Sequence, residues 1–273
     1  ITLIMSTSCT KNSKKKPMKL EQKEKAPKTL TTVMDGIDEI LVSIDNIEEV
    51  AILTESEFEI EESKKGKKDS KPKEENKPED SKQQATKQKE EENKTITKDE
   101  NIFTLWKDID KKIAEIHKNW NSYEVESINK GANLEKANIL KRNLNLFTTS
   151  IENRNIRDII DTGSKTFNSL AFFFDLYKDE TSGDLSKIKY SIYQAYLKAE
   201  ISDINEAKKL LDLTEEYSVR IRQRLGKDKE KIKLLDKLLL SISDMKLALD
   251  NNSIKLLKIK RDIVLKNIKS LEK

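Results

Sequence analysis

Apolar residues recur every three or four positions through most of residues 97–273, which is the spacing of amphipathic helices. The clearest case is the stretch Asn155–Lys178, where the spacing holds throughout. Phe172 and Phe173 widen its apolar stripe until the C-terminal half is apolar almost all round, as expected of a helix enclosed by others. We therefore expect this helix to be the centre around which the following helices pack.

The same spacing predicts an all-α fold for this part of the chain. Thr97-Lys-Asp-Glu100 forms a capping-box pattern, Asp203-Ile-Asn-Glu206 caps a helix, and Gly226 ends one. No window shows the alternation of a half-buried strand. The predicted architecture is a bundle of about six to seven amphipathic helices preceded by a disordered tether. The helices are expected around residues 102–120, 134–151, 155–178, 185–199, 204–225, 232–249 and 254–271.

The single cysteine, Cys9, follows the short apolar run ITLIMSTS and precedes the lysine-rich stretch TKNSKKKPMK. An apolar run, small residues and then a cysteine are typical of the end of a lipoprotein signal peptide (residues 1–9), whose cysteine is lipidated. The pattern is of the relaxed kind, because Ser6 stands where leucine is usual. A buried N-terminal strand with a chance cysteine is the alternative. Lipidation of Cys9 would anchor the protein to a membrane without crossing it.

Charge divides the rest of the first hundred residues into three segments. Residues 10–28 contain eight lysines, and next to a lipid anchor we expect them to lie against anionic headgroups. Residues 29–62 hold eleven acidic residues and no Lys or Arg. Their apolar spacing predicts a short amphipathic helix that docks on the main domain or, alternatively, on a partner. Residues 63–96 are rich in Lys and Glu with few apolar side chains, which predicts a disordered linker before the helical domain at 97–273.

The residues needed for familiar catalytic or cofactor sites are missing from the sequence. One cysteine and one histidine exclude a disulfide framework, a multi-cysteine zinc site and a histidine cluster. No glycine-rich phosphate-binding motif occurs. His117 fits a surface or capping residue better than a catalyst, and Phe172–Phe174 fit core packing better than a ligand pocket. We therefore predict a protein that is not an enzyme and that needs no metal or cofactor.

Positive charge is concentrated near the C-terminus. Residues 101–219 hold 17 basic and 19 acidic side chains, whereas residues 220–273 hold 16 basic and 7 acidic, a net charge of +9. Such a surface attracts polyanions and releases counterions on binding without reading a sequence. Residues 220–273 contain no aromatic residue to stack on bases, and no helix-turn-helix pattern. The alternative is a solvated lysine-rich surface that binds nothing.

The predicted polyanion-binding residues follow from charge alone. Three arginines end the helix before Gly226 and four lysines open the next one, while the lysines of the last helix form a stripe that we expect to face solvent. The complete set is Arg220, Arg222, Arg224, Lys227, Lys229, Lys231, Lys233, Lys255, Lys258, Lys260, Arg261, Lys266 and Lys269.

The layout of the whole chain resembles the plasmid-encoded outer-surface lipoproteins of Lyme-disease spirochaetes (Borrelia). The resemblance rests on the stretch ITLIMSTSCTKNSKKK with its relaxed lipobox at Cys9, on the Lys/Glu tether and on the helical domain rich in Lys, Ile and Asn. Among these proteins it looks like paralogous family twelve. That resemblance implies a non-enzymatic, all-helical cell-surface protein that binds DNA without sequence preference. A related helical group of the same bacteria binds complement regulators.

Two functions remain open from the sequence. In the first, a lipid-anchored protein of the outer membrane, on the cell surface, binds DNA or another polyanion, such as a glycosaminoglycan, through residues 220–273. In the second, the helical domain is an adhesin or complement-evasion module that binds a host protein through a partly apolar patch. Steep salt dependence is typical of the first, and sensitivity to uncharged surface substitutions is typical of the second.

Overall fold

The computed structural model describes residues 25–68, 96–177 and 181–272. Within these ranges the chain forms nine α-helices and no β-strand, which confirms the predicted all-α bundle, and all seven helices expected after residue 97 are present. The helices are α1 (Lys28–Ala51), α2 (Glu55–Lys68), α3 (Lys98–Asn129), α4 (Leu134–Glu152), α5 (Ile156–Phe174), α6 (Ser182–Glu200), α7 (Ile204–Leu225), α8 (Lys229–Ala248) and α9 (Ile254–Glu272).

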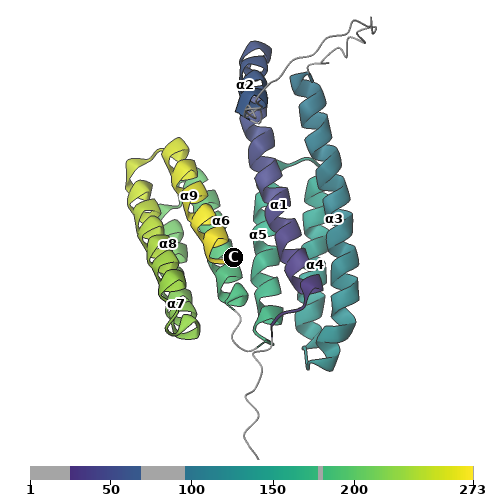
Figure 1. The fold of residues 1–273 in the computed structure, drawn as a ribbon, viewed down its shortest axis with the longest axis vertical. Helices are drawn as coiled ribbons and strands as arrows, with labels where there is room; N and C mark the ends of the chain where they lie inside the picture. Colours follow the sequence, from purple (N-terminus) through teal and green to yellow (C-terminus); the bar gives the residue numbers. More distant parts are fainter. Residues whose placement is uncertain (1–24, 69–95, 178–180, 273) are drawn as a thin grey trace, which may run out of the picture.

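The helices pack around two hydrophobic cores (Figure 1). Helices α1, α3, α4 and α5 build the first core, and α6, α7, α8 and α9 build the second. The successive helices α5 and α6 pack closely against each other and join the two halves. Tyr193 and Leu197 of α6 belong to the first core, and Leu265 of α9 packs against both. The fold is therefore a pair of four-helix bundles, with α2 as an appendage of the first.

Helix α5 is enclosed by α1, α4 and α6, as its apolar sequence predicts. Phe167 and Phe173 have no exposed surface. Gly163 lies in the apolar stripe because its neighbours approach closely: a Cβ there would lie 2.9 Å from Phe147 Cε2 and 3.1 Å from Leu41 Cδ2. The expectation that every later helix wraps α5 is wrong, because α7, α8 and α9 pack on α6 and on one another.

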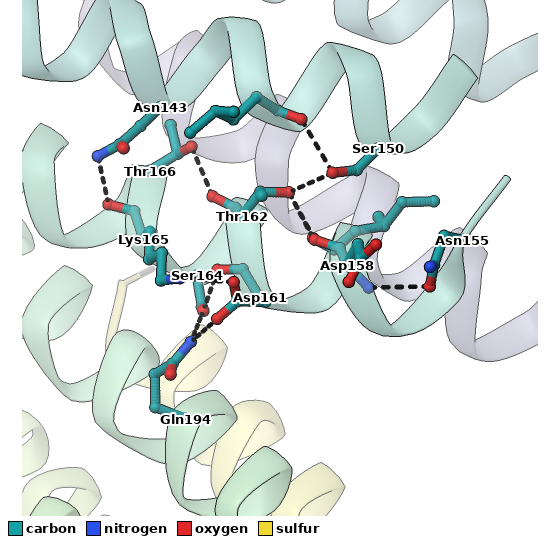
Figure 2. A network of polar contacts seen from close by, with 12 residues as sticks. Asn143, Ser150, Asn155, Asp158, Asp161, Thr162, Ser164, Lys165, Thr166 and Gln194 are labelled. Atoms are coloured by element: carbon teal, nitrogen blue, oxygen red, sulfur yellow. Dashed lines mark hydrogen bonds and ion pairs between the residues drawn. The ribbon is translucent and has the colours of Figure 1, made fainter. Parts of the chain in front are cut away.

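Polar side chains of α5 form hydrogen bonds to the helices on either side (Figure 2). The Gln194 side-chain amide of α6 donates to Asp161 Oδ1 at 2.9 Å and to Ser164 Oγ at 2.8 Å. On the α4 side, the Asn143 amide donates to the Lys165 carbonyl at 3.3 Å. These bonds offset the cost of removing the polar groups from water and so help to fix the position of α5 between α4 and α6.

The acidic segment 29–62 belongs to the folded domain. Helix α1 buries nine residues, among them Leu30, Ile37 and Ile44, and packs mainly against α3. Docking of this helix within its own chain is therefore confirmed. The predicted domain boundary at residue 97 is wrong, because α1 forms one wall of the first core and its removal would expose apolar faces of α3 and α5.

Helix α2 differs from the expectation of one short helix followed by a tether. The Thr54 backbone N–H donates to Glu57 Oε2 at 2.8 Å, and the Glu57 N–H donates to Thr54 Oγ1 at 3.3 Å. This reciprocal cap starts a second helix that continues to Lys68, so the first residues of the segment 63–96 are helical. Apolar spacing misses α2 because Phe58 is the one large apolar side chain that its described residues bury.

Several predicted helix ends are confirmed. The Glu100 N–H donates to Thr97 Oγ1 at 3.2 Å while the Thr97 N–H donates to Glu100 Oε2 at 3.1 Å, which completes the capping box of α3. Gly226 ends α7 with a φ of +60°, which a residue with a Cβ rarely adopts. The lipidation motif at Cys9, the basic segment up to residue 24 and residues 69–95 of the predicted tether lie outside the described residues.

Replacing Ile37 by alanine tests the contribution of α1 to the first core. Ile37 is fully buried, so we expect Ile37→Ala to lower the free energy of unfolding by about 2–5 kcal/mol. The matched control is Ile52→Ala, because Ile52 is 83% exposed just after α1 and its loss should change that free energy by less than about 0.5 kcal/mol. Denaturant unfolding of the full chain, followed by circular dichroism, measures both. Equal losses would contradict the packing of α1.

A second prediction concerns stability at high pH. Burial raises the pKa of Tyr123 and Tyr193. Burial alone would lower the pKa of Lys189, but Asp38 and Glu272 outweigh it and raise that pKa. A group whose pKa is raised in the folded state stabilises the fold below its unfolded pKa, and this contribution is lost as the pH rises through the folded value. The melting temperature should therefore fall above about pH 10, and a constant value there would contradict the prediction.

Candidate polyanion-binding surface

The thirteen basic residues predicted to bind polyanions fall into two groups. Seven form ion pairs with carboxylates of the same chain: Arg220, Arg222, Arg224, Lys258, Lys260, Arg261 and Lys269. The other six form no ion pair within 4.0 Å among the described residues: Lys227, Lys229, Lys231, Lys233, Lys255 and Lys266. A cation already balanced by a carboxylate contributes little to the field that attracts a polyanion, so the second group matters most.

Arg220 and Arg224 hold α7 against the start of α6. Their shared partner is Asp184, which lies in the first turn of α6 and has no exposed surface. Arg220 donates from Nε at 2.9 Å and from Nη2 at 2.7 Å to Asp184 Oδ1, and Arg224 donates from Nη1 to Oδ2 at 2.7 Å. The hydrogen bond to Asp184 raises the pKa of Arg220. Because a buried charge without its partner is strongly unfavourable, these arginines serve the fold first.

Arg261 is a core residue, which corrects its assignment to the binding surface. Its side chain is fully buried, with the guanidinium 4.6 Å from the centre of the Tyr196 ring. Nη2 donates to Asp45 Oδ1 at 2.6 Å, and Nε donates to Asp262 Oδ1 at 2.8 Å. Burial alone would lower the pKa of Arg261, but the two carboxylates outweigh it and raise that pKa. Arg261 therefore joins α9 to α1 and is closed to a polyanion.

The acidic side of α1 also neutralises part of the lysine stripe of α9. Lys269 Nζ lies 2.9 Å from Asp35 Oδ1, and Lys258 Nζ lies 3.2 Å from Glu48 Oε2. Lys260 pairs with a carboxylate of α8. This corrects the expected solvent-facing stripe, because carboxylates balance Lys258, Lys260 and Lys269. Within the described chain, Lys255 and Lys266 are the two lysines of the predicted stripe that form no ion pair.

Four of the six lysines without an ion pair lie where α7 ends and α8 begins. Figure 1 shows this corner at the same end of the molecule as the start of α1 and the end of α9. We call five residues the corner lysines: Lys227, Lys229, Lys231, Lys233 and Lys237. Lys229, Lys233 and Lys237 form a row on one side of α8, about 6 Å apart at a rise of about 1.5 Å per residue. All three are exposed.

Lys237 is missing from the set predicted from charge, although the sequence carries its signal. It lies four residues after Lys233 and eight after Lys229, so helical spacing places all three on one face. Lys237 forms no ion pair with a described residue. The prediction applies helical spacing to the lysines of the last helix, but takes those after Gly226 only as a run along the chain, and so it omits Lys237.

Three acidic residues lie among the corner lysines in the sequence, and two of them, Asp228 and Glu230, keep an unpaired negative charge among the described residues. Asp228 accepts a hydrogen bond from the Lys231 backbone N–H at 3.1 Å and so caps α8. Asp236 pairs with Arg222 of α7. Glu230 is exposed and reduces the net positive charge, whereas the N-terminal end of the α8 dipole adds to it. The corner is therefore a small positive surface whose attraction for anions should be sensitive to salt.

The lone histidine links two helices of the first bundle. His117 Nε2 of α3 lies 2.8 Å from Thr148 Oγ1 of α4, and burial lowers the pKa of His117. Across residues 25–68, 96–177 and 181–272, no group of three or more His, Cys, Asp or Glu side chains is arranged to hold a metal ion. None of the described helices is both long and apolar enough to cross a membrane.

A cleft of about 730 Å³ lies beside α1 and is also lined by α3, α6 and α9. We call it the α1–α9 cleft. At one end the buried Lys189 of α6 lies 2.6 Å from both Asp38 Oδ2 of α1 and Glu272 Oε1 of α9. At the other end Arg261 contacts Asp45, as described above. Ion pairs therefore connect the two bundles on either side of an open space.

Comparison with known proteins finds no family model, no curated protein and no solved structure that matches this chain. The resemblance to spirochaete surface lipoproteins therefore stays a prediction from the sequence, and a function has to be argued from the surface and the cleft themselves.

Proposed function

We propose that this chain is a lipid-anchored surface protein that binds DNA or another polyanion, without sequence preference, through the corner lysines. The observation that carries the proposal is the exposed row Lys229, Lys233 and Lys237, which has no described carboxylate within ion-pair distance. The site is smaller than the set predicted from charge, because seven of those thirteen residues already pair within the chain. We assign no reaction to the protein.

Lysine-based contacts favour recognition of phosphate or sulfate groups over recognition of bases. A lysine ammonium is a compact charge on a flexible stem, and contacts to a phosphate backbone position a protein without carrying sequence information. Residues 220–273 contain no aromatic residue that could stack on a base. Duplex DNA of any sequence and sulfated glycosaminoglycans are therefore the expected partners.

The membrane part of the proposal rests on the sequence around Cys9. Acyl chains on this cysteine would tether the protein to the outer membrane, with the helical domain on the cell surface. The lysine-rich residues 10–28 would lie next to the acyl chains, where basic residues are attracted by anionic headgroups. This arrangement leaves the α7–α8 corner as a separate basic surface of the folded domain.

A host-protein partner is the second candidate, and one observation favours it. Leu240 and Leu247 of α8 are 73% and 65% exposed. Since they lie seven residues apart, they share one face of the helix. Binding anchored by such leucines would depend weakly on salt and would be lost on a change to an uncharged polar residue.

Neutralising four corner lysines tests the polyanion proposal. We expect the full chain to shift unrelated duplex DNAs and heparin alike in a gel-shift titration. With about four phosphate contacts, the affinity should fall about 10²-fold between about 50 and 200 mM salt. The variant with Lys227, Lys229, Lys233 and Lys237 changed to Gln should bind much more weakly. Its slope of log affinity against log salt should be shallower by about one for each lysine that contacts a phosphate.

The matched control removes the same charge elsewhere. Lys64, Lys107, Lys118 and Arg142 are exposed and form no ion pair with a described residue. Changing these four to Gln should leave both the affinity and the slope nearly unchanged. An equal loss in both variants would mean that net charge, and not the corner, sets the affinity. Failure of the unmodified chain to bind at low salt would exclude polyanion binding and direct attention to Leu240 and Leu247.

Arg261→Gln separates a core role from a binding role. Removal of this fully buried guanidinium breaks its ion pair with Asp45, whose side chain is 18% exposed, so we expect the free energy of unfolding to fall by about 3–5 kcal/mol. At a temperature where the variant is still folded, its affinity for duplex DNA should equal that of the unmodified chain. Denaturant unfolding and gel shift on the same preparation measure the two quantities. A weaker gel shift from the folded variant would show that Arg261 contributes to DNA binding.

A further inference from the structure

We infer that the α1–α9 cleft binds a single-chain amphiphile: an alkyl chain that carries one anionic head group. This site lies apart from the corner lysines and does not depend on the polyanion proposal. The inference rests on three features of the lining, which are its exposed apolar surface, its balance of charge and its volume.

The apolar surface of the cleft is incompletely covered. Val42 lies in the lining and is 56% exposed, in a helix that buries nine other residues. Leu265 of α9 also lines the cleft and is partly buried. The deeper lining includes Tyr193 of α6, which is 3% exposed. An alkyl chain laid along the cleft would remove Val42 and Leu265 from water, which is the main source of affinity for an apolar ligand.

One lysine of the lining has no partner among the described carboxylates. Each of the six carboxylates that line the cleft already has a cation within 4.0 Å: Asp38 with Lys189, Glu39 with Lys112, Asp45 and Asp262 with Arg261, Glu49 with Lys258, and Asp108 with Lys111. Of the four lysines in the lining, Lys266 forms no ion pair with a described residue. Lys266 is therefore the one lysine of the lining without a carboxylate partner among the described residues. The lining as a whole is not positive, because its six carboxylates outnumber its four lysines.

This charge balance selects the kind of ligand. A cationic head group would find a cation already within 4.0 Å of every carboxylate in the lining. A ligand with many anionic groups would be repelled by Glu39 and Glu49, whose side chains are 59% and 63% exposed. A ligand with one carboxylate or one phosphate beside Lys266 avoids both difficulties, because that group forms a charge-assisted hydrogen bond with an unpaired cation. The volume of about 730 Å³ lies within the range of about 300–1,000 Å³ that small-molecule sites occupy.

Calorimetric titration with dodecanoate and dodecyl phosphate, below their micelle concentrations, tests the proposal on the full chain. We expect one molecule of either to bind per chain, dodecanol to bind about tenfold more weakly, and acetate not to bind. Comparison of the carboxylate and the phosphate shows whether a fatty acid or a lipid phosphate is the better ligand. If neither amphiphile binds, the proposal is wrong.

Two pairs of variants locate the head group and the alkyl chain. Lys266→Gln should weaken dodecanoate about tenfold and leave dodecanol unchanged, whereas Lys255→Gln, an unpaired lysine of α9 outside the cleft, should change neither. Val42→Asp should weaken both ligands more than tenfold, and Leu240→Asp, an equally drastic change at an exposed position of α8, should weaken neither.

An uncharged, bulky substitution tests whether the loss of binding comes from blocking the cleft or from the added charge. Asn46 is exposed and lines the cleft, so Asn46→Trp should obstruct the alkyl chain without adding charge and should weaken both dodecanoate and dodecanol. Circular dichroism of each variant shows whether it is folded. If Leu240→Asp weakens binding as much as Val42→Asp, or if Asn46→Trp has no effect, the ligand lies outside the cleft and the proposal fails. Since none of these residues is a corner lysine, the outcome is independent of the gel-shift experiment.

Discussion

Ion pairs between the acidic face of α1 and cations of α6 and α9 connect the two bundles, and they form when the apolar face of α1 is buried in the first core. Asp38 meets Lys189 of α6, Asp45 meets Arg261 of α9, and Asp35 meets Lys269 of α9. Two of these cations, Lys189 and Arg261, are almost fully buried. A buried ion pair adds little net stability, because desolvation offsets the attraction, but a mismatched arrangement would leave a buried charge alone. The pairs therefore act mainly by excluding other positions of α9 relative to α1.

This arrangement changes what the positive charge of the C-terminal part means. Residues 220–273 carry a net charge of +9 as a sequence, a value that already counts the carboxylates of α8. Part of this charge is balanced by carboxylates outside the range, in α1 and α6. Among the described basic residues of this part, Arg261 is the fully buried one, in keeping with a planar guanidinium that donates to two carboxylates at once. Lysines remain at the surface of the α7–α8 corner. The unbalanced charge is thus smaller and more local than the composition indicates.

Helical periodicity was enough to predict the fold class, the seven helices after residue 97 and several of their caps, because these depend on residues close in the chain. The same periodicity places Arg261 four residues after Leu257 and so on the buried face of α9. Its partner is beyond local reasoning, because Asp45 lies 216 positions away. The division into two cores is likewise a long-range property. Helix α2 was not predicted although its signal is local, because a polar cap at Thr54 defines it more than apolar spacing does.

The two kinds of charged surface should respond differently to salt. The corner lysines are exposed, so their attraction for an anion is screened over a Debye length of about 10 Å at 0.1 M salt. The pairs of Lys189 and Arg261 lie at contact distance and out of water, where mobile ions screen them much less. Moderate salt therefore weakens what the corner attracts while the buried pairs keep α1 and α9 in place. If the chain binds a polyanion as proposed, loss of that binding with salt would report on the corner itself and not on opening of the fold.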